Sequence, residues 1–451
     1  MSRDKEQFKK IAVAIVIGLF FFALSFSVFN ATQASLIGLI AFLVTLWTNE
    51  GLPLGVVSLL PIVLFPSFSI LSTSDTTANY ANPIIFLFFG GFLIAIAVEK
   101  TELHKWVTEK MFAIFPSTPK GIIFSLTITS GLLSSLLSNT TTTLLLISIV
   151  LFITDDIRLK MRFALAIAYG ASIGGILTPI GTAPNLIMLG FMQNNQMDPI
   201  PFLQWMLMVS PLVFAMFFIV ASLLSIGVKD VEISIEHQNR VLNFEQKRVL
   251  WLIGGVILLL LLNAPFKPYW NGLGLNENII LLGAGLILFA PPFGTLDWME
   301  DKVKIPFRIM FLFGAGFSIA SAFSATGLAD EVATYLIVIT QLHPILIILC
   351  VAMLITFTTE ITSNTALISV MLPVIYAVSQ QSGIDAVLFM MVATVCASYA
   401  FMLPIATPPN AIAMSSGAVS VKDMARYGVV FNFIGIFLIA MIAEFFWKGF
   451  L

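Results

Sequence analysis

Two short polar stretches interrupt long apolar runs and constrain this chain more than any other feature. The tripeptide Ser138-Asn139-Thr140 returns, 225 residues later, as Ser363-Asn364-Thr365. A second interruption follows each copy and carries its own Asn, 46 residues after the Asn of the tripeptide. These interruptions read TPIGTAPN at 178–185 and LPIATPPN at 403–410. Polar stretches repeated at one register in an apolar chain indicate two structural repeats with a binding site between them.

The composition is that of an integral membrane protein. Of the 451 residues, 59% are hydrophobic and 10% are charged, whereas a soluble domain has about 25% charged residues. The apolar runs approach the roughly 20 residues that a membrane-spanning helix needs, and they lack the alternation of a β-barrel strand. The net charge of −2 gives no indication of a nucleic-acid partner. Both cysteines, Cys350 and Cys396, lie in apolar runs, so we expect small core residues rather than a disulfide.

The apolar runs predict an all-α polytopic membrane protein with about eleven membrane-spanning helices. The predicted spans are residues 11–29, 34–47, 54–71, 83–98, 163–191, 202–226, 249–262, 278–291, 306–323, 386–415 and 427–446. Two pairs of shorter arms surround the tripeptides, 121–137 with 141–153 and 345–356 with 366–378, and each pair predicts a re-entrant hairpin. The stretches 99–115 and 330–340 mix charged and apolar residues, as interfacial helices do.

The basic residues support this topology. With two hairpins and eleven spans, 20 of the 22 Lys and Arg residues fall on the side of the N-terminus, and only Lys267 and Lys448 fall outside it. The positive-inside rule therefore places the N-terminus in the cytoplasm and the C-terminus outside, in a multi-pass plasma-membrane or inner-membrane protein. Five crossings separate span 83–98 from its counterpart 306–323, so the two repeats are predicted to be inverted.

The polar stretches suit small ions. Ser, Thr and Asn are good helix N-caps, and a helix N-terminus inside the membrane attracts an anion, while hydroxyl, amide and carbonyl oxygens suit Na⁺. Since no Lys or Arg lies deep in a predicted span, the charge of a carboxylate would be met by helix ends, polar side chains and bound cations. The alternative is that these residues only hold helices together. Glu360, beside the second tripeptide, is either a functional acid or a structural one that binds backbone.

These motifs resemble those of the divalent anion:sodium symporter family of di- and tricarboxylate transporters. The resemblance covers nearly the whole chain from span 83–98 onward. It implies a homodimer in which a scaffold domain holds the dimer contact and a transport domain moves like an elevator. Residues 1–115 and 229–340 would form the scaffold, and residues 116–228 and 341–451 the transport domain.

The resemblance also implies the site residues. The anion would be bound by Ser138, Asn139, Thr140, Thr182, Ser363, Asn364, Thr365, Thr407 and Pro408. A first sodium site would be formed by Ser134, Ser138, Asn139 and Gly181, and a second by Thr359, Thr362, Asn364 and Ala406.

The expected function is sodium-coupled symport of C4-dicarboxylates such as succinate, with Na⁺ at two sites or more. Intact Ser, Thr and Asn at the implied cation positions favour sodium coupling over the sodium-independent exchange that other family members perform. An intramembrane enzyme would need a nucleophile–base pair, an Asp dyad or a metal site at depth, and the sequence shows none. A channel is disfavoured by the closed hairpins.

Overall fold

The protein is mainly helical in the residues that its computed structural model describes, which are 2–229, 233, 241–265, 269–336 and 341–450. Within these ranges, seven helices are long and apolar enough to cross a membrane, and four shorter apolar helices accompany them. The prediction of an all-α polytopic membrane protein is therefore confirmed, whereas the number of eleven spans stays a prediction. Lys267 and the end of the interfacial stretch 330–340 lie outside the described residues.

The two repeats are visible as two matching series of helices. The first series is α6 (Pro83–Lys100), α7 (Leu103–Ile114), α8 (Pro119–Ser134), α9 (Asn139–Ile153), α10 (Ile157–Gly174), α11 (Ala183–Asn194) and α12 (Phe202–Ser225). The second is α16 (Phe307–Thr326), α17 (Leu328–Leu336), α18 (Pro344–Thr359), α19 (Asn364–Ser382), α20 (Ala386–Ala397), α21 (Pro408–Ser415) and α22 (Val421–Phe445). Helices α8 and α18 correspond residue by residue at the offset of 225.

The remaining helices precede each series. They are α1 (Ser2–Ser25), α2 (Ala31–Asn49), α3 (Leu54–Val57), α4 (Leu60–Ser67), α5 (Thr73–Ala78) and the 3₁₀ turn η1 (Asn79–Ala81), then α13 (Phe244–Asn263), α14 (Glu277–Leu286) and α15 (Trp298–Asp301). The expected single span 54–71 is thus two short helices. Pro61 lies in the first turn of α4, and the hydroxyl of Ser58 donates to the Leu54 carbonyl at the end of α3.

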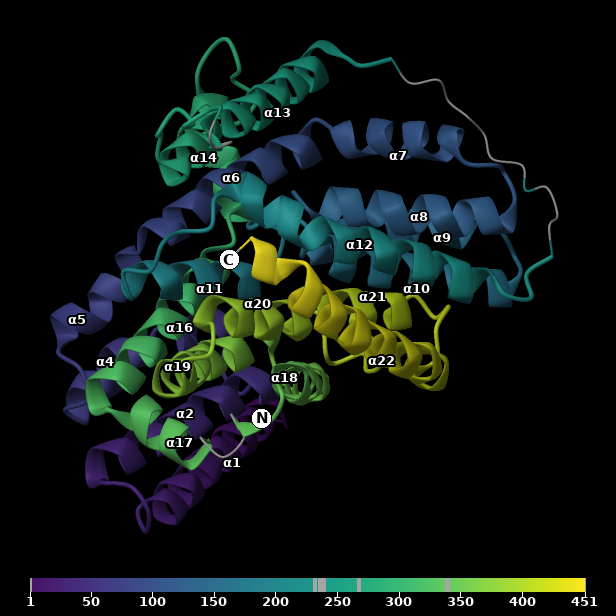
Figure 1. The fold of residues 1–451 in the computed structure, drawn as a ribbon. Helices are drawn as coiled ribbons and strands as arrows, with labels where there is room; N and C mark the ends of the chain where they lie inside the picture. Colours follow the sequence, from purple (N-terminus) through teal and green to yellow (C-terminus); the bar gives the residue numbers. More distant parts are fainter. Residues whose placement is uncertain (1, 230–232, 234–240, 266–268, 337–340, 451) are drawn as a thin grey trace.

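The two repeats interlock. Helix α11 of the first repeat packs against α19 and α20 of the second, while α21 of the second packs against α9 and α10 of the first. In Figure 1, α1, α2, α4, α5, α6, α13 and α14 lie at the upper, left and lower margins, α11 and α20 lie near the middle, and α8, α9, α10, α12, α21 and α22 lie toward the right side. Each half-helix that follows a break is therefore held by the opposite repeat.

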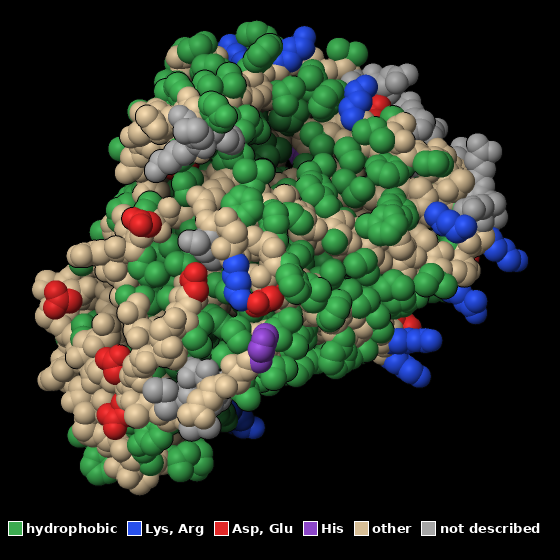
Figure 2. Space-filling view, viewed as in Figure 1, with side chains coloured by type: hydrophobic (Ala, Val, Ile, Leu, Met, Phe, Trp, Pro, Cys, Tyr) green, Lys and Arg blue, Asp and Glu red, His purple; other side chains and the backbone are tan. Residues whose placement is uncertain are grey.

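The outer surface matches a lipid environment. Figure 2 shows apolar side chains over a broad central face, with most Lys and Arg side chains at its margins. Phe214 and Phe218 of α12 and Phe437 and Phe445 of α22 are all exposed. Both cysteines are free, as expected, but only Cys396 is a core residue, because Cys350 is exposed on α18.

Candidate functional site

Each Ser-Asn-Thr motif starts the second arm of a helical hairpin. Ser138 is the N-cap of α9 and its hydroxyl accepts from the Thr141 N–H at 3.1 Å. Ser363 is the N-cap of α19 and accepts from the Ala366 N–H at 3.5 Å. The Asn that follows each Ser is the first helical residue. The predicted capping role is confirmed, and both hairpin tips expose a helix N-terminus.

The two expected helix breaks are also present, and each is bridged by one Asn side chain. Asn185 Nδ2 donates to the carbonyls of Gly175 and Thr178 at 3.3 and 2.9 Å. Asn410 Nδ2 donates to the carbonyls of Ala400 and Leu403 at 2.8 and 3.0 Å. These contacts are equivalent at the 225-residue offset, and they pair carbonyl groups that the breaks remove from helical hydrogen bonding. Pro residues in the first turns of α11 and α21 fix where each half-helix begins.

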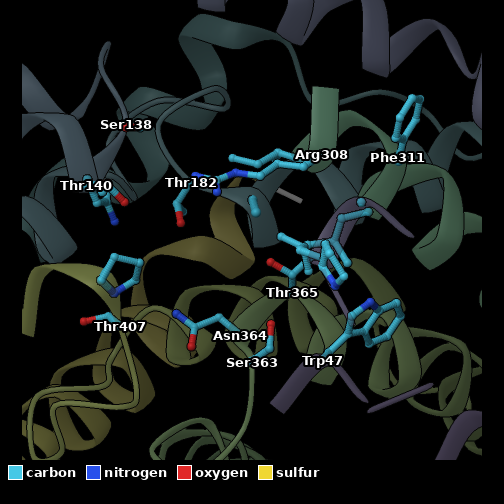
Figure 3. Close-up of a pocket in the computed structure, with 18 of the residues that line it drawn as sticks. Trp47, Ser138, Thr140, Thr182, Arg308, Phe311, Ser363, Asn364, Thr365 and Thr407 are labelled. Atoms are coloured by element: carbon cyan, nitrogen blue, oxygen red, sulfur yellow. The ribbon is translucent and has the colours of Figure 1, made fainter. Parts of the chain in front are cut away.

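Four helix N-termini meet at one cavity of about 1220 Å³. Asn139, Ala183, Asn364 and Pro408, the first residues of α9, α11, α19 and α21, all line it. Figure 3 shows Thr140 and Thr182 facing Asn364, Thr365 and Thr407 across this space. Because each N-terminus carries roughly half a positive charge and unpaired N–H groups, the cavity is suited to an anion.

Oxygen atoms converge beside the first motif. Ser134 Oγ donates to Asn139 Oδ1 at 2.6 Å, and Ser134 is fully buried. Asn139 Oδ1 and the Gly181 carbonyl oxygen lie 2.7 and 3.2 Å from the point where a Cβ on Gly175 would stand. A hydroxyl, an amide oxygen and a backbone carbonyl are the donor types that a hard cation such as Na⁺ prefers.

The second motif repeats this arrangement, with Thr in place of Ser and Ala in place of both Gly residues. Thr359 Oγ1 donates to Asn364 Oδ1 at 2.6 Å and to the Ala397 carbonyl at 2.9 Å. The positions equivalent to Gly175 and Gly181 are Ala400 and Ala406. Both oxygen clusters therefore pair a hydroxyl with the amide oxygen of an Asn, and they differ in the residues beside that pair.

The structure brings most of the predicted residues together. The cavity is lined by all nine residues predicted to bind the anion, which are Ser138, Asn139, Thr140, Thr182, Ser363, Asn364, Thr365, Thr407 and Pro408. Of the predicted cation ligands, Gly181 and Ala406 also line it. Ser134 and Thr359 lie behind the two Asn side chains, and Thr362 Oγ1 donates to the Thr358 carbonyl of its own hairpin arm at 2.8 Å. The assignment of individual roles stays a prediction.

The sequence did not indicate that the basic side chain of Arg308 would line the cavity. Arg308 lies in the first turn of α16 and lines the cavity together with both motifs. The cavity wall therefore holds a basic side chain, which the absence of Lys and Arg deep in the predicted spans did not indicate. Arg308 counted as a loop charge in the topology, because it lies at the end of an apolar run. No motif in the sequence signalled that this helix end faces the hairpin tips.

Glu360 binds backbone and an amide. Its carboxylate accepts from the N–H groups of Met402 and Leu403 at 2.9 and 3.0 Å and from Asn432 Nδ2 at 2.7 Å. The side chain thus connects the second hairpin tip to the second break and to α22. In the first repeat the equivalent Ser135 offers its carbonyl to the hydroxyl of Thr178. This geometry favours the structural interpretation of Glu360.

The fold and the cavity define a membrane transporter built from two interlocked repeats, and comparisons with known proteins agree. A sequence model described as "Citrate transporter" matches residues 40–394, and the chain belongs to this family. It is 30% identical to the sodium-dependent dicarboxylate transporter SdcS of Staphylococcus saprophyticus, over 96% of this chain and 91% of that protein. It is 29% identical to the SdcS of Staphylococcus aureus strain RF122, over 98% and 92%.

Two solved structures share the fold at low sequence identity. MtrF of Neisseria gonorrhoeae matches with a TM-score of 0.59 and 12% identity, over 84% of this chain and 85% of that one. The YdaH transporter of Alcanivorax borkumensis matches with a TM-score of 0.53 and 12% identity, over 83% and 87%. The resemblance to divalent anion:sodium symporters drawn from the motifs is confirmed, and these relatives are transporters rather than enzymes.

Gly175→Ala tests the first oxygen cluster. The added Cβ would lie 2.7 Å from Asn139 Oδ1, so the amide has to move away from the Gly181 carbonyl. Overpacking of this kind costs about 1–3 kcal/mol, or roughly tenfold or more in affinity. We expect the Na⁺ concentration that half-saturates the thermal stabilisation of the purified protein to rise about tenfold. Gly449→Ala is the control, because Gly449 does not line the cavity and nothing lies within 4 Å of its added Cβ. Equal half-saturating Na⁺ concentrations for the two variants would contradict the assignment of this cluster as a Na⁺ site.

Glu360→Gln tests the structural role of the buried acid. The amide NH₂ of Gln would face N–H donors, so at least one of the three hydrogen bonds is lost. Leaving such a group unpaired costs about 1–3 kcal/mol. We expect a lower Tm in detergent for Glu360→Gln and an unchanged Tm for Glu245→Gln, an exposed acid at the start of α13. An unchanged Tm for Glu360→Gln would argue for the functional interpretation instead.

Proposed function

We propose that this protein is a secondary active transporter that couples the uptake of a C4-dicarboxylate, such as succinate, to the entry of Na⁺. The observation that carries the proposal is the meeting of four helix N-termini and two oxygen clusters at one cavity. The names of the SdcS relatives, at 29–30% identity over nearly the full chain, support both the ion and the substrate class.

The arrangement explains why the anion and the cations would bind together. Asn139 and Asn364 each belong to a hairpin tip that lines the cavity, and each amide oxygen is held by a buried hydroxyl, Ser134 or Thr359. A cation at these oxygens would hold the tip and add positive charge beside the helix N-termini. A dicarboxylate would then bind more tightly, and by linkage it would raise the affinity for Na⁺ equally.

We further propose alternating access by an elevator-type motion. The moving part would comprise residues 116–228 and 341–451, and the scaffold residues 1–115 and 229–340. The cavity is lined by the start of α1, the end of α2 and the start of α16. Away from the cavity, polar contacts join the far ends of α6, α11 and α16. Asn194 bonds Asn82 at 2.8 Å and Asn79 at 3.4 Å, and Ser321 bonds Asn79 at 3.0 Å. These contacts would close the path from the cavity to one side of the membrane while the cavity is open to the other side.

The proposed orientation and assembly follow from charge and surface. The basic residues near the start of α1 favour an N-terminus in the cytoplasm of a plasma-membrane or inner-membrane protein, and eleven spans would then put the C-terminus outside. A homodimer would use the scaffold, where Trp251 of α13 and Ile279 of α14 are exposed. Next to them, Gly254 and Gly283 leave open space that a second copy could occupy.

Uptake of labelled succinate into proteoliposomes tests the function. We expect uptake to require an inward Na⁺ gradient. Asn139→Ala and Asn364→Ala should each reduce it at least tenfold, because hydrogen bonds to charged groups contribute about 1.5–3 kcal/mol. Asn195→Ala is a matched control, since Asn195 Nδ2 bonds only the Phe191 carbonyl of its own helix. Uptake that ignores Na⁺ but requires dicarboxylate inside the vesicles would establish an exchanger instead.

Asn194→Ala tests the closed side of the cavity. Removing this amide breaks both contacts to the end of α6 and η1, so the conformation open to the other side should become more populated. The reporter is Leu136→Cys, which lines the cavity, in a Cys350→Ser background. A membrane-impermeant maleimide should label this cysteine faster from the side opposite the present opening.

The control for this labelling is Asn195→Ala in the same background, which removes an amide next to Asn194 without touching α6. Equal labelling rates in the two variants would show that the Asn194 contacts do not hold the cavity closed.

A further inference from the structure

Arg308 is the charged side chain of α16 that lines the cavity. Among the described residues it makes no hydrogen bond and no ion pair, and its side chain is exposed. It lines the same cavity as both Ser-Asn-Thr motifs. Figure 3 shows its side chain directed toward Thr182, the N-cap of α11. The hydroxyl of Thr182 makes no capping hydrogen bond, unlike that of Thr407, which accepts from the Asn410 N–H.

The other charges of the cavity leave Arg308 available. Four charged side chains line it: Glu6, Lys10, Glu50 and Arg308. Lys10 Nζ lies 3.8 Å from Glu6 Oε1, one turn away on α1. Glu50 ends α2, and no ion pair joins it to Arg308 in the described part of the chain. Arg308 is therefore the cavity's one basic side chain without an acidic neighbour among the described residues.

We propose that Arg308 binds a carboxylate of the substrate on the Thr182 side of the cavity and selects doubly charged anions over singly charged ones. The inference rests on the proposed function and adds a residue to it. The guanidinium is always charged and presents paired N–H donors that match the two oxygens of a carboxylate. Helix N-termini and amides offer only partial charges, which a singly charged anion can also satisfy. A full positive charge distinguishes the dianion.

The position of Arg308 separates it from the binding motifs. It belongs to α16, whereas the motifs start α9 and α19 and the breaks precede α11 and α21. The stem of Arg308 packs on α3, where a Cβ on Gly55 would lie 3.4 Å from the Arg308 Cβ. Since this contact involves the stem and not the guanidinium, Arg308→Gln retains it and removes only the charge and the paired donors.

The test compares three variants reconstituted in proteoliposomes: Arg308→Gln, Arg308→Lys and the control Lys302→Gln. Lys302 lies six residues before Arg308, does not line the cavity, and carries the same charge. The KM for succinate is measured with Na⁺ present and with succinate presented on each side in turn. Inhibition by monomethyl succinate, which keeps the chain length but lacks one charge, gives the selectivity.

We expect Arg308→Gln to raise the KM for succinate about tenfold or more on at least one side, since a bond to a charged group is lost. The preference for succinate over its monomethyl ester should fall by a similar factor, and the Na⁺ concentration for half-maximal uptake should change less than twofold. Arg308→Lys should be intermediate, because it keeps the charge without the paired donors, and Lys302→Gln should behave like the unmodified protein.

Two results would overturn the proposal. One is an unchanged KM and selectivity in Arg308→Gln, and the other is an equal change in Lys302→Gln, which would reveal only a general attraction of anions. Either result leaves Na⁺-driven succinate uptake by the unmodified protein intact. Absence of that uptake would contradict the proposed function itself, so the two failures are distinguishable.

Discussion

The amide bridges of Asn185 and Asn410 are the interactions on which the rest of the site depends. A helix that stops inside an apolar environment leaves carbonyl groups without partners, each at a cost of several kcal/mol. Each Asn donates to two such carbonyls from the first turns of the following half-helix. The chain can therefore break at this depth, restart as α11 or α21, and present a helix N-terminus to the cavity.

The two repeats share these amide bridges but differ in the residues around them. Gly175 lies close beside the Asn139 amide, and the residues equivalent to Gly175 and Gly181 in the second repeat are Ala400 and Ala406. The connection from hairpin tip to break also differs: a hydroxyl of the break donates to the Ser135 carbonyl in the first repeat, and two N–H groups donate to the Glu360 carboxylate in the second. The second break is thus held by a charged acceptor and by Asn432, and we infer that it is the more rigid of the two.

The features of the site that depend on short-range interactions could be predicted from the sequence. The capping of α9 by Ser138 and of α19 by Ser363, the breaks and the repeat register all follow from short-range hydrogen bonding and proline geometry. Two other features depend on packing between distant segments. Glu360 meets Asn432, 72 residues later, only because α22 lies against α18. Arg308 faces the motifs only because α3 and α16 pack together at the cavity. Neither the Glu360–Asn432 contact nor the position of Arg308 can be inferred from hydrophobic periodicity or from counting charges.

Arg308 also bears on how a substrate could drive a conformational change. A ligand shifts an equilibrium only if it makes different contacts in the two states. The motifs and the half-helices interlock into one body, so on the proposed division their contacts with a bound anion would travel with it. Arg308 belongs to the other body, and its contact would exist in one state alone. While a dianion is bound, the positive charge of Arg308 on the scaffold would therefore favour the conformation in which the cavity includes Arg308. Release on that side would have to overcome this contact, whereas a singly charged anion would leave more readily.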